Sequence, residues 1–359
     1  MSRILRNPKN LAVLVLVSAL FFLGLIGGAL GKEFGAGFLG APLAHIQLSA
    51  EPVTSKPVFT NLPILGDFVI TNTMVATWAT VIILSMVSFL GTRQVKEVPG
   101  RLQSLLEMIL EFFLNLATSV AGPEKARRFF PLVTTIFLFI VVANWIGILP
   151  GFGTIGRFEP AEEVIHHAED VAKKTDSHMD RSRINLQIFD VAGGIAYLPL
   201  GSVGTEINGS NYKQVTGNDQ HAGLLVPFLR SANTDVNTTL ALALVAMFAV
   251  HWWGFSTLGF LSHMGKFINI RTGFMGMFVG ILEGISEIAR LISFTFRLFG
   301  NIFAGEVLLI AIAFLVPLIG LVPFLGLELF VGLIQAFIFS MLTLVFAATA
   351  TSSHSEADH

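Results

Sequence analysis

Apolar runs long enough to cross a lipid bilayer dominate this sequence. A hydrocarbon core of about 30 Å requires about 20 apolar residues per helix. Runs of this kind are Leu11–Leu30, Thr73–Leu90, Phe129–Leu149, Thr238–Phe260 and the much longer region Gly273–Ala350. Only 13% of the 359 residues are charged, whereas soluble domains carry about 25%. The sequence therefore predicts an all-α, polytopic membrane protein with about five membrane-embedded helices.

The composition and the short motifs exclude several functional classes. The net charge is −2 and there is no Cys, which excludes a basic nucleic-acid binder, a disulfide scaffold and every Cys-ligated metal site. Gly151–Gly156 fits the dinucleotide pattern but follows a membrane helix instead of a strand. His166 and His167, with Glu163 or Glu169, are interpreted as a solvated helix face. We expect no cofactor, no metal and no catalytic residue in this chain.

The first apolar run has two interpretations. Arg3, Arg6 and Lys9 precede it and small residues follow it, as in a secretory signal. Its length equally suits an uncleaved helix. Residues 1–31 are therefore either a signal-like segment or an extra transmembrane helix.

Lys and Arg residues predict the orientation, because cytoplasmic loops are enriched in them. Residues 91–128 carry six, namely Arg93, Lys96, Arg101, Lys125, Arg127 and Arg128, whereas residues 31–70 carry only Lys32 and Lys56. The N-terminus and residues 91–128 are therefore expected in the cytoplasm. This requires Arg101–Val120, with Glu107 and Glu111 one turn apart, to be an in-plane amphipathic helix that does not cross.

A hydrophilic insert, residues 157–230, interrupts the apolar runs and is expected outside. We expect a short helix over Glu159–Lys174 and one or two strands within Ile184–Leu200, forming a small mixed lid or docking element. We expect five regions along the chain. Residues 1–31 form the signal-like or extra transmembrane helix, residues 32–156 the first membrane helices with the amphipathic helix, and residues 157–230 the insert. Residues 231–350 form an ion-channel core, and residues 351–359 a cytoplasmic tail.

Six ionisable residues lie within the last apolar region: Glu283, Glu287, Arg290, Arg297, Glu306 and Glu328. A charge at mid-bilayer costs about 2.5–3.5 kcal/mol, so such groups pair or line a wet path. Glu283, Glu287 and Arg290 lie near one end, where a surface cluster is an equally good interpretation. Arg297 has no acid within one turn, which points to a functional role.

Helical geometry separates the polar groups around Arg297. Gly273–Val316 would measure about 66 Å as one helix, and we predict one long tilted helix in a C-terminal hairpin. Glu306, nine residues after Arg297, falls on the opposite face and about 13.5 Å along the axis. Ser293 and Asn301 flank Arg297 at four residues, and Glu328 and Gln335 share a face of the final helix. This arrangement predicts two half-paths for an ion, separated by a fixed positive charge.

The segment Phe296–Glu306, FRLFGNIFAGE, resembles the signature of subunit a of the rotary F-type ATP synthase. Other segments resemble the same family in the same order, from about Thr60 to Ala350 without the insert. They are Pro99–Gln103, Asn144–Pro150, Asp235–Leu240 and Gln335–Phe339. The resemblance implies a non-catalytic stator subunit with two proton half-channels that face a rotating ring of c subunits.

The resemblance also implies roles for single residues. Arg297 matches the arginine that faces the ring, Asn301, Glu306 and Gln335 match the outer half-channel, and Ser293 and Glu283 match the cytoplasmic side. Glu328 stands where some members carry His. The implied partners are the c ring, the peripheral-stalk b subunits, other synthase subunits and the lipid of a bacterial inner membrane, with no nucleic acid.

Other functions remain as alternatives. A Na⁺-translocating form of the same subunit would look alike in this chain, because the ion's ligands lie mainly on the ring. A secondary ion transporter would also carry intramembrane charges, although such proteins usually show internal repeats, and none is evident here.

Overall fold

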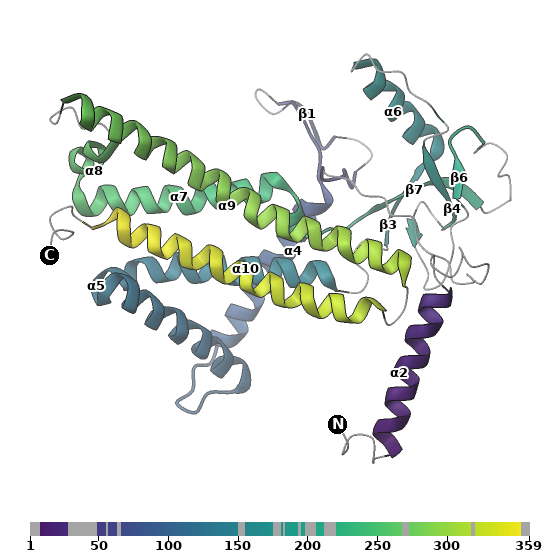
Figure 1. Ribbon diagram of the computed structural model, residues 1–359, viewed down its shortest axis with the longest axis horizontal. Helices are drawn as coiled ribbons and strands as arrows, with labels where there is room; N and C mark the ends of the chain where they lie inside the picture. The colour runs from purple at the N-terminus through teal and green to yellow at the C-terminus, as the bar shows by residue number, and fades with distance from the viewer. Residues whose placement is uncertain are drawn as a thin grey trace. The chain divides into compact units, whose positions relative to one another are not determined.

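The computed structural model describes residues 8–27, 49–54, 57–62, 66–149, 155–174, 181, 184–192, 195–197, 206–211, 220–267, 273–316 and 320–352. Several sequence expectations concern residues outside these ranges: the end of the signal-like segment, the first glycines of Gly151–Gly156, and the C-terminal tail beyond residue 352. Figure 1 traces the chain from its N-terminus to its C-terminus.

The chain divides into two compact units built from interleaved segments. We call them the sheet unit (Met1–Val75, Gly147–Arg230 and Ala304–Leu329) and the bundle unit (Ala76–Ile146, Ser231–Phe303 and Phe330–His359). Within the described residues, five helices are long and apolar enough to cross a membrane. The predicted class, an all-α polytopic membrane protein with a small sheet insert, is confirmed.

The five long helices coincide with the apolar runs of the sequence. They are α4 (Asn72–Thr92), α5 (Arg101–Ile148), α7 (Val236–Leu258), α9 (Gly273–Leu315) and α10 (Leu321–Ala350). A shorter apolar helix, α2 (Pro8–Gly27), covers most of the first run. Asp235 begins α7 because its side chain accepts a hydrogen bond from the backbone N–H of Asn237 at 2.9 Å.

The long α5 consists of two helices joined at Gly122. Gly122 has φ 77° and ψ 163°, a conformation that only glycine adopts without strain. Pro123 follows it and suits the first turn of the next helix. The break separates the predicted amphipathic segment from the apolar run that ends at Ile148.

The residues around Arg297 lie in one uninterrupted helix, α9, so the predicted single long helix is confirmed. Gly300 and Asn301, the mildest break in the sequence, are helical. Figure 1 shows α9 as one long rod. At 1.5 Å per residue its 43 residues extend over about 65 Å.

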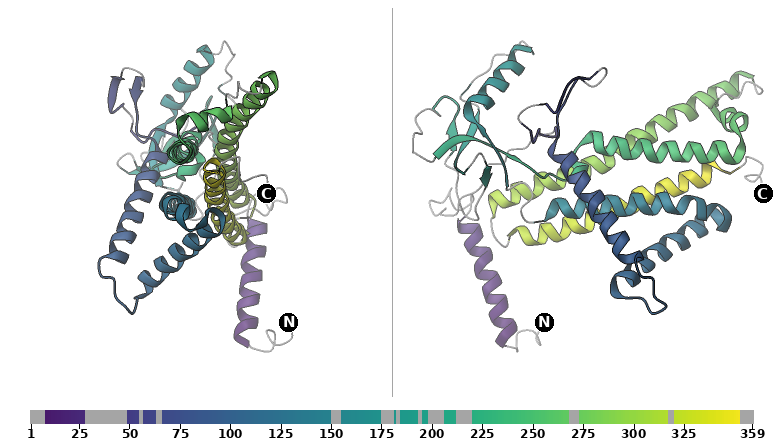
Figure 2. Two further views of the ribbon diagram at one scale, coloured as in Figure 1. Left: turned by 90° about the vertical axis from the view of Figure 1, so that its left-hand side faces the viewer. Right: turned by 180° about the vertical axis from the view of Figure 1, so that it is seen from behind.

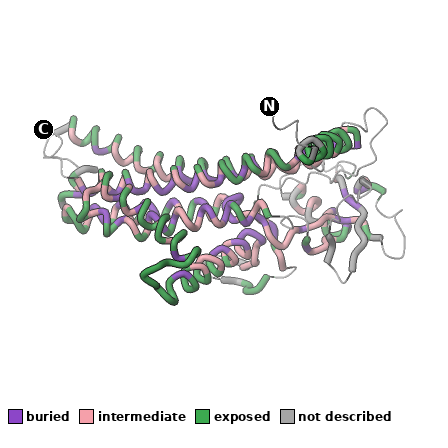
Figure 3. The backbone as a smooth tube through the Cα atoms, turned by 90° about the horizontal axis from the view of Figure 1, so that it is seen from below, coloured by how far each residue is buried: buried purple, intermediate pink, exposed green. Residues whose placement is uncertain are grey.

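Apolar side chains from four helices form the core of the bundle unit. One cluster contains Ile140 of α5, Ala246 of α7, Leu298 of α9 and Phe339 of α10, all at most 2% exposed. The two views in Figure 2 show these helices running alongside one another. Figure 3 shows buried residues alternating with exposed ones along them. The bundle therefore fixes which face of α9 stays exposed.

The sheet unit contains the hydrophilic insert, folded as five short antiparallel strands and one helix. They are β3 (Ile155–Pro160), α6 (Ala161–Lys174), β4 (Asn185–Ala192), β5 (Ile195–Tyr197), β6 (Glu206–Asn208) and β7 (Gln220–Pro227). The order is β5-β3-β7-β4-β6, and β5 also pairs with β4. The ladder thus closes on itself.

The predicted helix and strands of the insert are present with one shift. The helix begins at Ala161, whereas we expected Glu159, because Glu159 and Pro160 pair with Leu224 and Gly223 in the sheet. Strands β3, β6 and β7 were not predicted. Smaller elements elsewhere are the hairpin β1 (Phe59–Leu62) and β2 (Gly66–Phe68), the 3-10 turn η3 (Ala232–Thr234) and α8 (Phe260–Phe267).

Candidate functional site

Arg297 lies on an exposed, mostly apolar face of α9. Along the part of α9 that precedes it, Ile285, Ile288, Ile292 and Phe296 are all more than half exposed. Phe294, three residues before Arg297, and Leu298, the residue after it, are buried in the bundle core. The core packing therefore turns Arg297 outward, away from the interior of its own subunit.

Among the residues that the structure describes, the side chain of Arg297 has one hydrogen-bond partner, Ser293, one turn earlier. Nη2 donates to the Ser293 hydroxyl at 3.1 Å. No carboxylate oxygen lies within 4.0 Å of its guanidinium among the described residues. Of the predicted flanking pair, Ser293 contacts Arg297 and Asn301 does not.

Asn301 instead joins α9 to α10. Its Nδ2 donates to Oε1 of Gln335 at 2.7 Å. Gln335 is only 3% exposed, and its Nε2 has no partner among the described residues. A buried amide donor without a partner is costly, so this nitrogen marks a place for water or for an incoming group.

A second amide network holds α10 in place beside this pair. Asn144 on α5 donates to the backbone carbonyl of Gly332 at 3.2 Å, and Asn233 in η3 donates to Asn144 Oδ1 at 2.7 Å. A methyl group added at Gly332 would lie 3.1 Å from Cβ of Asn144. Gly332 thus permits the close helix contact that positions Gln335 one turn later.

Glu287 and Arg290 form an ion pair one turn apart on α9, and a histidine from α7 lies beside them. Arg290 bonds to Glu287 and lies 4.6 Å from the ring centre of Phe346. His251 Nε2 lies 3.7 Å from Glu287 Oε2. Glu283 does not join this cluster, and no partner is shown for it. Glu287, Arg290 and His251 therefore hold one another in defined positions, which differs from the surface cluster of Glu283, Glu287 and Arg290 that the sequence offered.

Glu306 forms a two-pronged ion pair in the sheet unit. Arg230 Nε lies 3.1 and 3.2 Å from the two carboxylate oxygens, and Nη2 lies 3.0 Å from Oε2. Arg230 Nη1 also donates to the backbone oxygen of Ser49 at 3.2 Å. Such a planar fork fixes both the position and the charge of the carboxylate.

Glu51 is a second carboxyl group near Arg230. It is 7% exposed, and Asn72 Nδ2 donates to its Oε2 at 3.3 Å. Burial raises the pKa of Glu51 to about 7. Arg230 and the Asn72 bond oppose this rise, while the neighbouring Glu159 and Glu306 add to it.

Glu328 is buried, and the described residues offer it no hydrogen-bond or ion-pair partner. Its carboxyl group lies against Gly305, where any added methyl group would collide with it. Gly305 immediately precedes Glu306 on α9, so the carboxyl group of Glu328, which comes from α10, lies beside the same stretch of α9 that carries Glu306. A lone buried carboxyl group in a membrane helix is typical of a proton path.

Sequence reasoning identified Arg297, Asn301, Gln335, Glu306 and Glu328 but missed their supports. Neither Arg230, the last residue of the expected insert, nor Glu51 was singled out. No local signal could have paired Arg230 with Glu306, 76 positions away. The polar character of the segment between the insert and α7 was the one sequence feature that drew attention to the region of Arg230.

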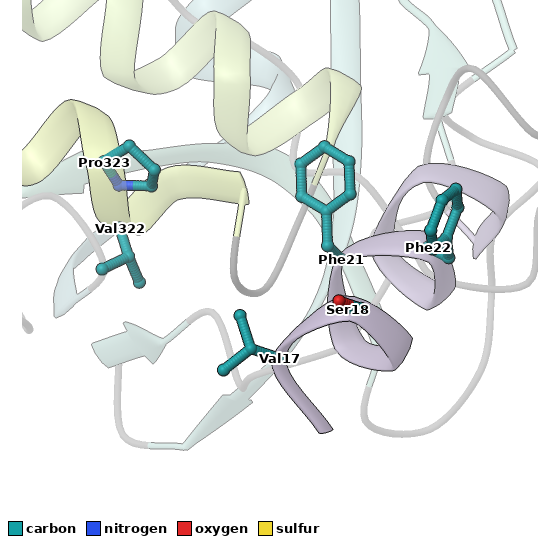
Figure 4. Close-up of a pocket in the computed structure, with 6 residues that line it drawn as sticks. All are labelled: Val17, Ser18, Phe21, Phe22, Val322 and Pro323. Atoms are coloured by element: carbon teal, nitrogen blue, oxygen red, sulfur yellow. The ribbon is translucent and has the colours of Figure 1, made fainter. Parts of the chain in front are cut away.

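Within the described residues, one apolar hollow and the histidines of α6 were the other candidates, and neither has the groups that a proton or metal site needs. An apolar hollow beside α2 and the start of α10 is lined by Val17, Ser18, Phe21, Phe22, Val322 and Pro323, so it has no titratable group (Figure 4). Within the described ranges, no cluster of three His, Asp or Glu residues suits a metal ion. His166 is ion-paired with Asp170 on the exposed face of α6 instead.

Long apolar helices with buried amides, paired acids and one outward arginine define a multi-pass membrane protein built for ion transport. The sequence model of the family described as ATP synthase A chain matches residues 74–348. The ATP synthase subunit a of Gloeobacter violaceus is 28% identical over 285 residues, which cover 79% of this chain and 85% of that protein.

The chain belongs to the ATP synthase A chain family. It therefore has the a-subunit role in an F-type ATP synthase, with other subunits of that enzyme as its partners. The resemblance noted in the sequence is confirmed.

Proposed function

We propose that this subunit provides two proton half-channels to a rotating c ring and so couples proton flow to ATP synthesis. One half-channel opens outside and contains Asn301, Glu306, Glu328 and Gln335. The other opens to the cytoplasm and contains Ser293 and Glu283. Arg297 separates the two. The chain itself performs no covalent chemistry.

The observation that carries this proposal is the outward position of Arg297. A guanidinium stays charged at physiological pH, and a charge facing lipid is costly. In the described part of its own chain, its guanidinium has a hydroxyl as its hydrogen-bond partner and no carboxylate within ion-pair distance. A carboxylate on a neighbouring subunit would satisfy it, and a ring of proton-binding carboxyl groups supplies one at each step of rotation.

The fixed charge has two consequences for proton transport. It attracts each ring carboxylate that has lost its proton, and it opposes a proton that would cross directly between the two paths. Protons must then travel around with the ring. The driving force is about 2.3 kcal/mol per charge for each 100 mV of membrane potential.

The remaining partners and the location follow from the same proposal. The b subunits of the peripheral stalk hold this chain still while the ring turns, and the complex lies in a bacterial inner membrane. A Na⁺-translocating enzyme is the alternative, and ion dependence of ATP synthesis distinguishes the two.

Ring contact is tested with single cysteines, because the natural chain has none. Ser286→Cys lies on an exposed side of α9, three turns before Arg297 and in nearly the same direction, and Phe248→Cys lies on an exposed face of α7. In the assembled enzyme with a cysteine on the outer ring helix, Ser286→Cys should form a disulfide-linked product and Phe248→Cys should not. Equal cross-linking from both positions would contradict the proposed ring-facing side.

A further inference from the structure

Arg230 is a buried cation that serves two carboxyl groups. It pairs directly with Glu306, and it interacts electrostatically with Glu51. Glu159 also faces Glu51 but has its own cation, Arg157, at 3.7 Å. Among the charged groups that the structure describes around them, Arg230 is the cation that acts on both Glu51 and Glu306, so ionising both acids places two negative charges beside one guanidinium.

The surroundings hold Glu51 in a fixed orientation. Its backbone N–H donates to Asn72 Oδ1 at 3.3 Å, and its carbonyl accepts from the Asn72 backbone N–H at 3.0 Å. The Asn72 amide also donates to the carboxyl group. Three hydrogen bonds to one residue keep the carboxyl group of Glu51 directed into this cluster at the start of α4.

We propose that Glu51 and Glu306 share one exchangeable proton and one guanidinium, so that Glu51 is a proton-binding residue of the outer path and Arg230 is its positioning residue. This inference rests on the proposed function, because it assigns a new member to the half-channel that contains Glu306.

The transfer involves no chemistry beyond proton movement. A hydronium ion on the outer side gives a proton to the Glu51 carboxylate and leaves a water molecule, and Arg230 then pairs fully with the ionised Glu306. The O–H bond at Glu51 breaks, an O–H bond forms at Glu306, and the guanidinium turns to the newly ionised Glu51. Once the proton is bound, one guanidinium and one proton balance the two carboxyl groups until Glu306 passes the proton onward.

The acidity of Glu51 suits this role. Burial raises its pKa to about 7 against the attraction of Arg230. The group is therefore loaded below that pH and empty above it, and loading falls as the outer pH rises through about 7. The charged residues that face it are Arg230, Glu159 and Glu306.

A purely structural role is the rival interpretation. The same hydrogen bonds anchor residues 49–54 to the start of α4, and Glu51 would then need no proton. The two interpretations differ in the pH profile, because an anchor does not titrate during transport.

The test measures ATP synthesis by the complete enzyme in proteoliposomes whose lumen faces the outer side of the protein. The lumenal pH is varied around 7, and a K⁺ diffusion potential keeps the total driving force constant. The wild-type rate should fall as the lumenal pH rises through this range. Glu51→Gln should be several-fold slower and should lose that step, while the exposed control Glu163→Gln should match wild type.

Two further variants keep the inference testable if the Glu51→Gln enzyme assembles poorly. Asn72→Ala removes a bond that favours the ionised Glu51, so the step should move to higher pH. Arg230→Lys keeps the charge without the fork and should retain the step at a lower rate. A wild-type pH profile in Glu51→Gln, or an unmoved step in Asn72→Ala, overturns the inference.

Arg297→Gln in the same vesicles separates this inference from the proposed function. Blocked synthesis in Arg297→Gln together with an unchanged profile in Glu51→Gln rejects only the role of Glu51. Normal synthesis in an assembled Arg297→Gln enzyme rejects the half-channel proposal itself.

Discussion

Arg297 and Glu306 are nine residues apart on one helix, yet their surroundings are opposite in kind. Glu306 is neutralised by Arg230 within the sheet unit. Arg297 has only the Ser293 hydroxyl within the bundle unit. Glu306, which is paired within its own chain, is suited to conduct protons. Arg297, which has no carboxylate beside it among the described residues, is suited to attract one from another subunit.

Loss of either outer carboxyl group should slow transport without abolishing it. Glu306→Gln and Glu328→Gln each leave the other acid in the path, so each rate should fall by less than about 100-fold, the low end for a positioned proton-transfer group. The double variant should be slower than both. ATP-driven acidification of inverted vesicles measures this, and full rates in both single variants would place the path elsewhere.

Gly305 should be needed for the position of Glu328. In Gly305→Ala the new methyl group takes the place of the Glu328 carboxyl group, so that side chain must turn away. Acidification should slow while the amount of assembled subunit stays the same. Gly326→Ala on α10, where nothing lies within 4 Å of the added methyl group, is the matched control. Equal rates in the two variants would show that Glu328 works from another position.

At the scale of elements, Gly122 sets the angle between the two parts of α5. Its φ of 77° excludes a side chain without strain, and Gly122→Ala should cost about 1–3 kcal/mol. The thermal midpoint of the purified complex should fall, or less subunit should assemble. Gly100→Ala, which has ordinary backbone angles and open space, should behave as wild type. A smaller loss in Gly122→Ala than in Gly100→Ala would contradict this role.

The helices were predictable because each carries its own signal. Spanning length, apolar composition and Pro or Gly at the ends are local properties, and α4, α7 and α9 agree with the runs within a few residues. The strands β3, β6 and β7 were not predictable, since each depends on pairing with a strand far away in the sequence: β3 with β7, and both β6 and β7 with β4.

The candidate site divides in the same way. Arg297, Glu306 and Glu328 stand out because a charge in an apolar run is unusual wherever its partner lies. Arg230 and Glu51 lie in polar segments, where charges are ordinary. Their importance comes from their burial and from the pairing of Arg230 with Glu306 across 76 positions, and the neighbouring residues in the sequence predict neither property.

At the scale of the whole molecule, the question is which loops between the five long helices lie on the cytoplasmic side of the membrane. The Lys and Arg residues of 91–128 predict that this stretch is cytoplasmic and that the insert is outside. Glu162→Cys on α6 and Val95→Cys after α4 are both exposed. In whole cells with a permeable outer envelope, a membrane-impermeant thiol reagent should label Glu162→Cys, and in inverted vesicles it should label Val95→Cys. The reverse pattern would invert the topology.

The measurement that tests the central claim most directly is ATP-driven acidification of inverted vesicles by Arg297→Gln. Gln keeps hydrogen-bonding capacity but carries no charge, so acidification should disappear although the enzyme assembles. The control Arg93→Gln removes an exposed arginine at the end of α4 and should acidify normally. Normal acidification by a fully assembled Arg297→Gln enzyme would contradict the claim that this charge separates the two proton paths.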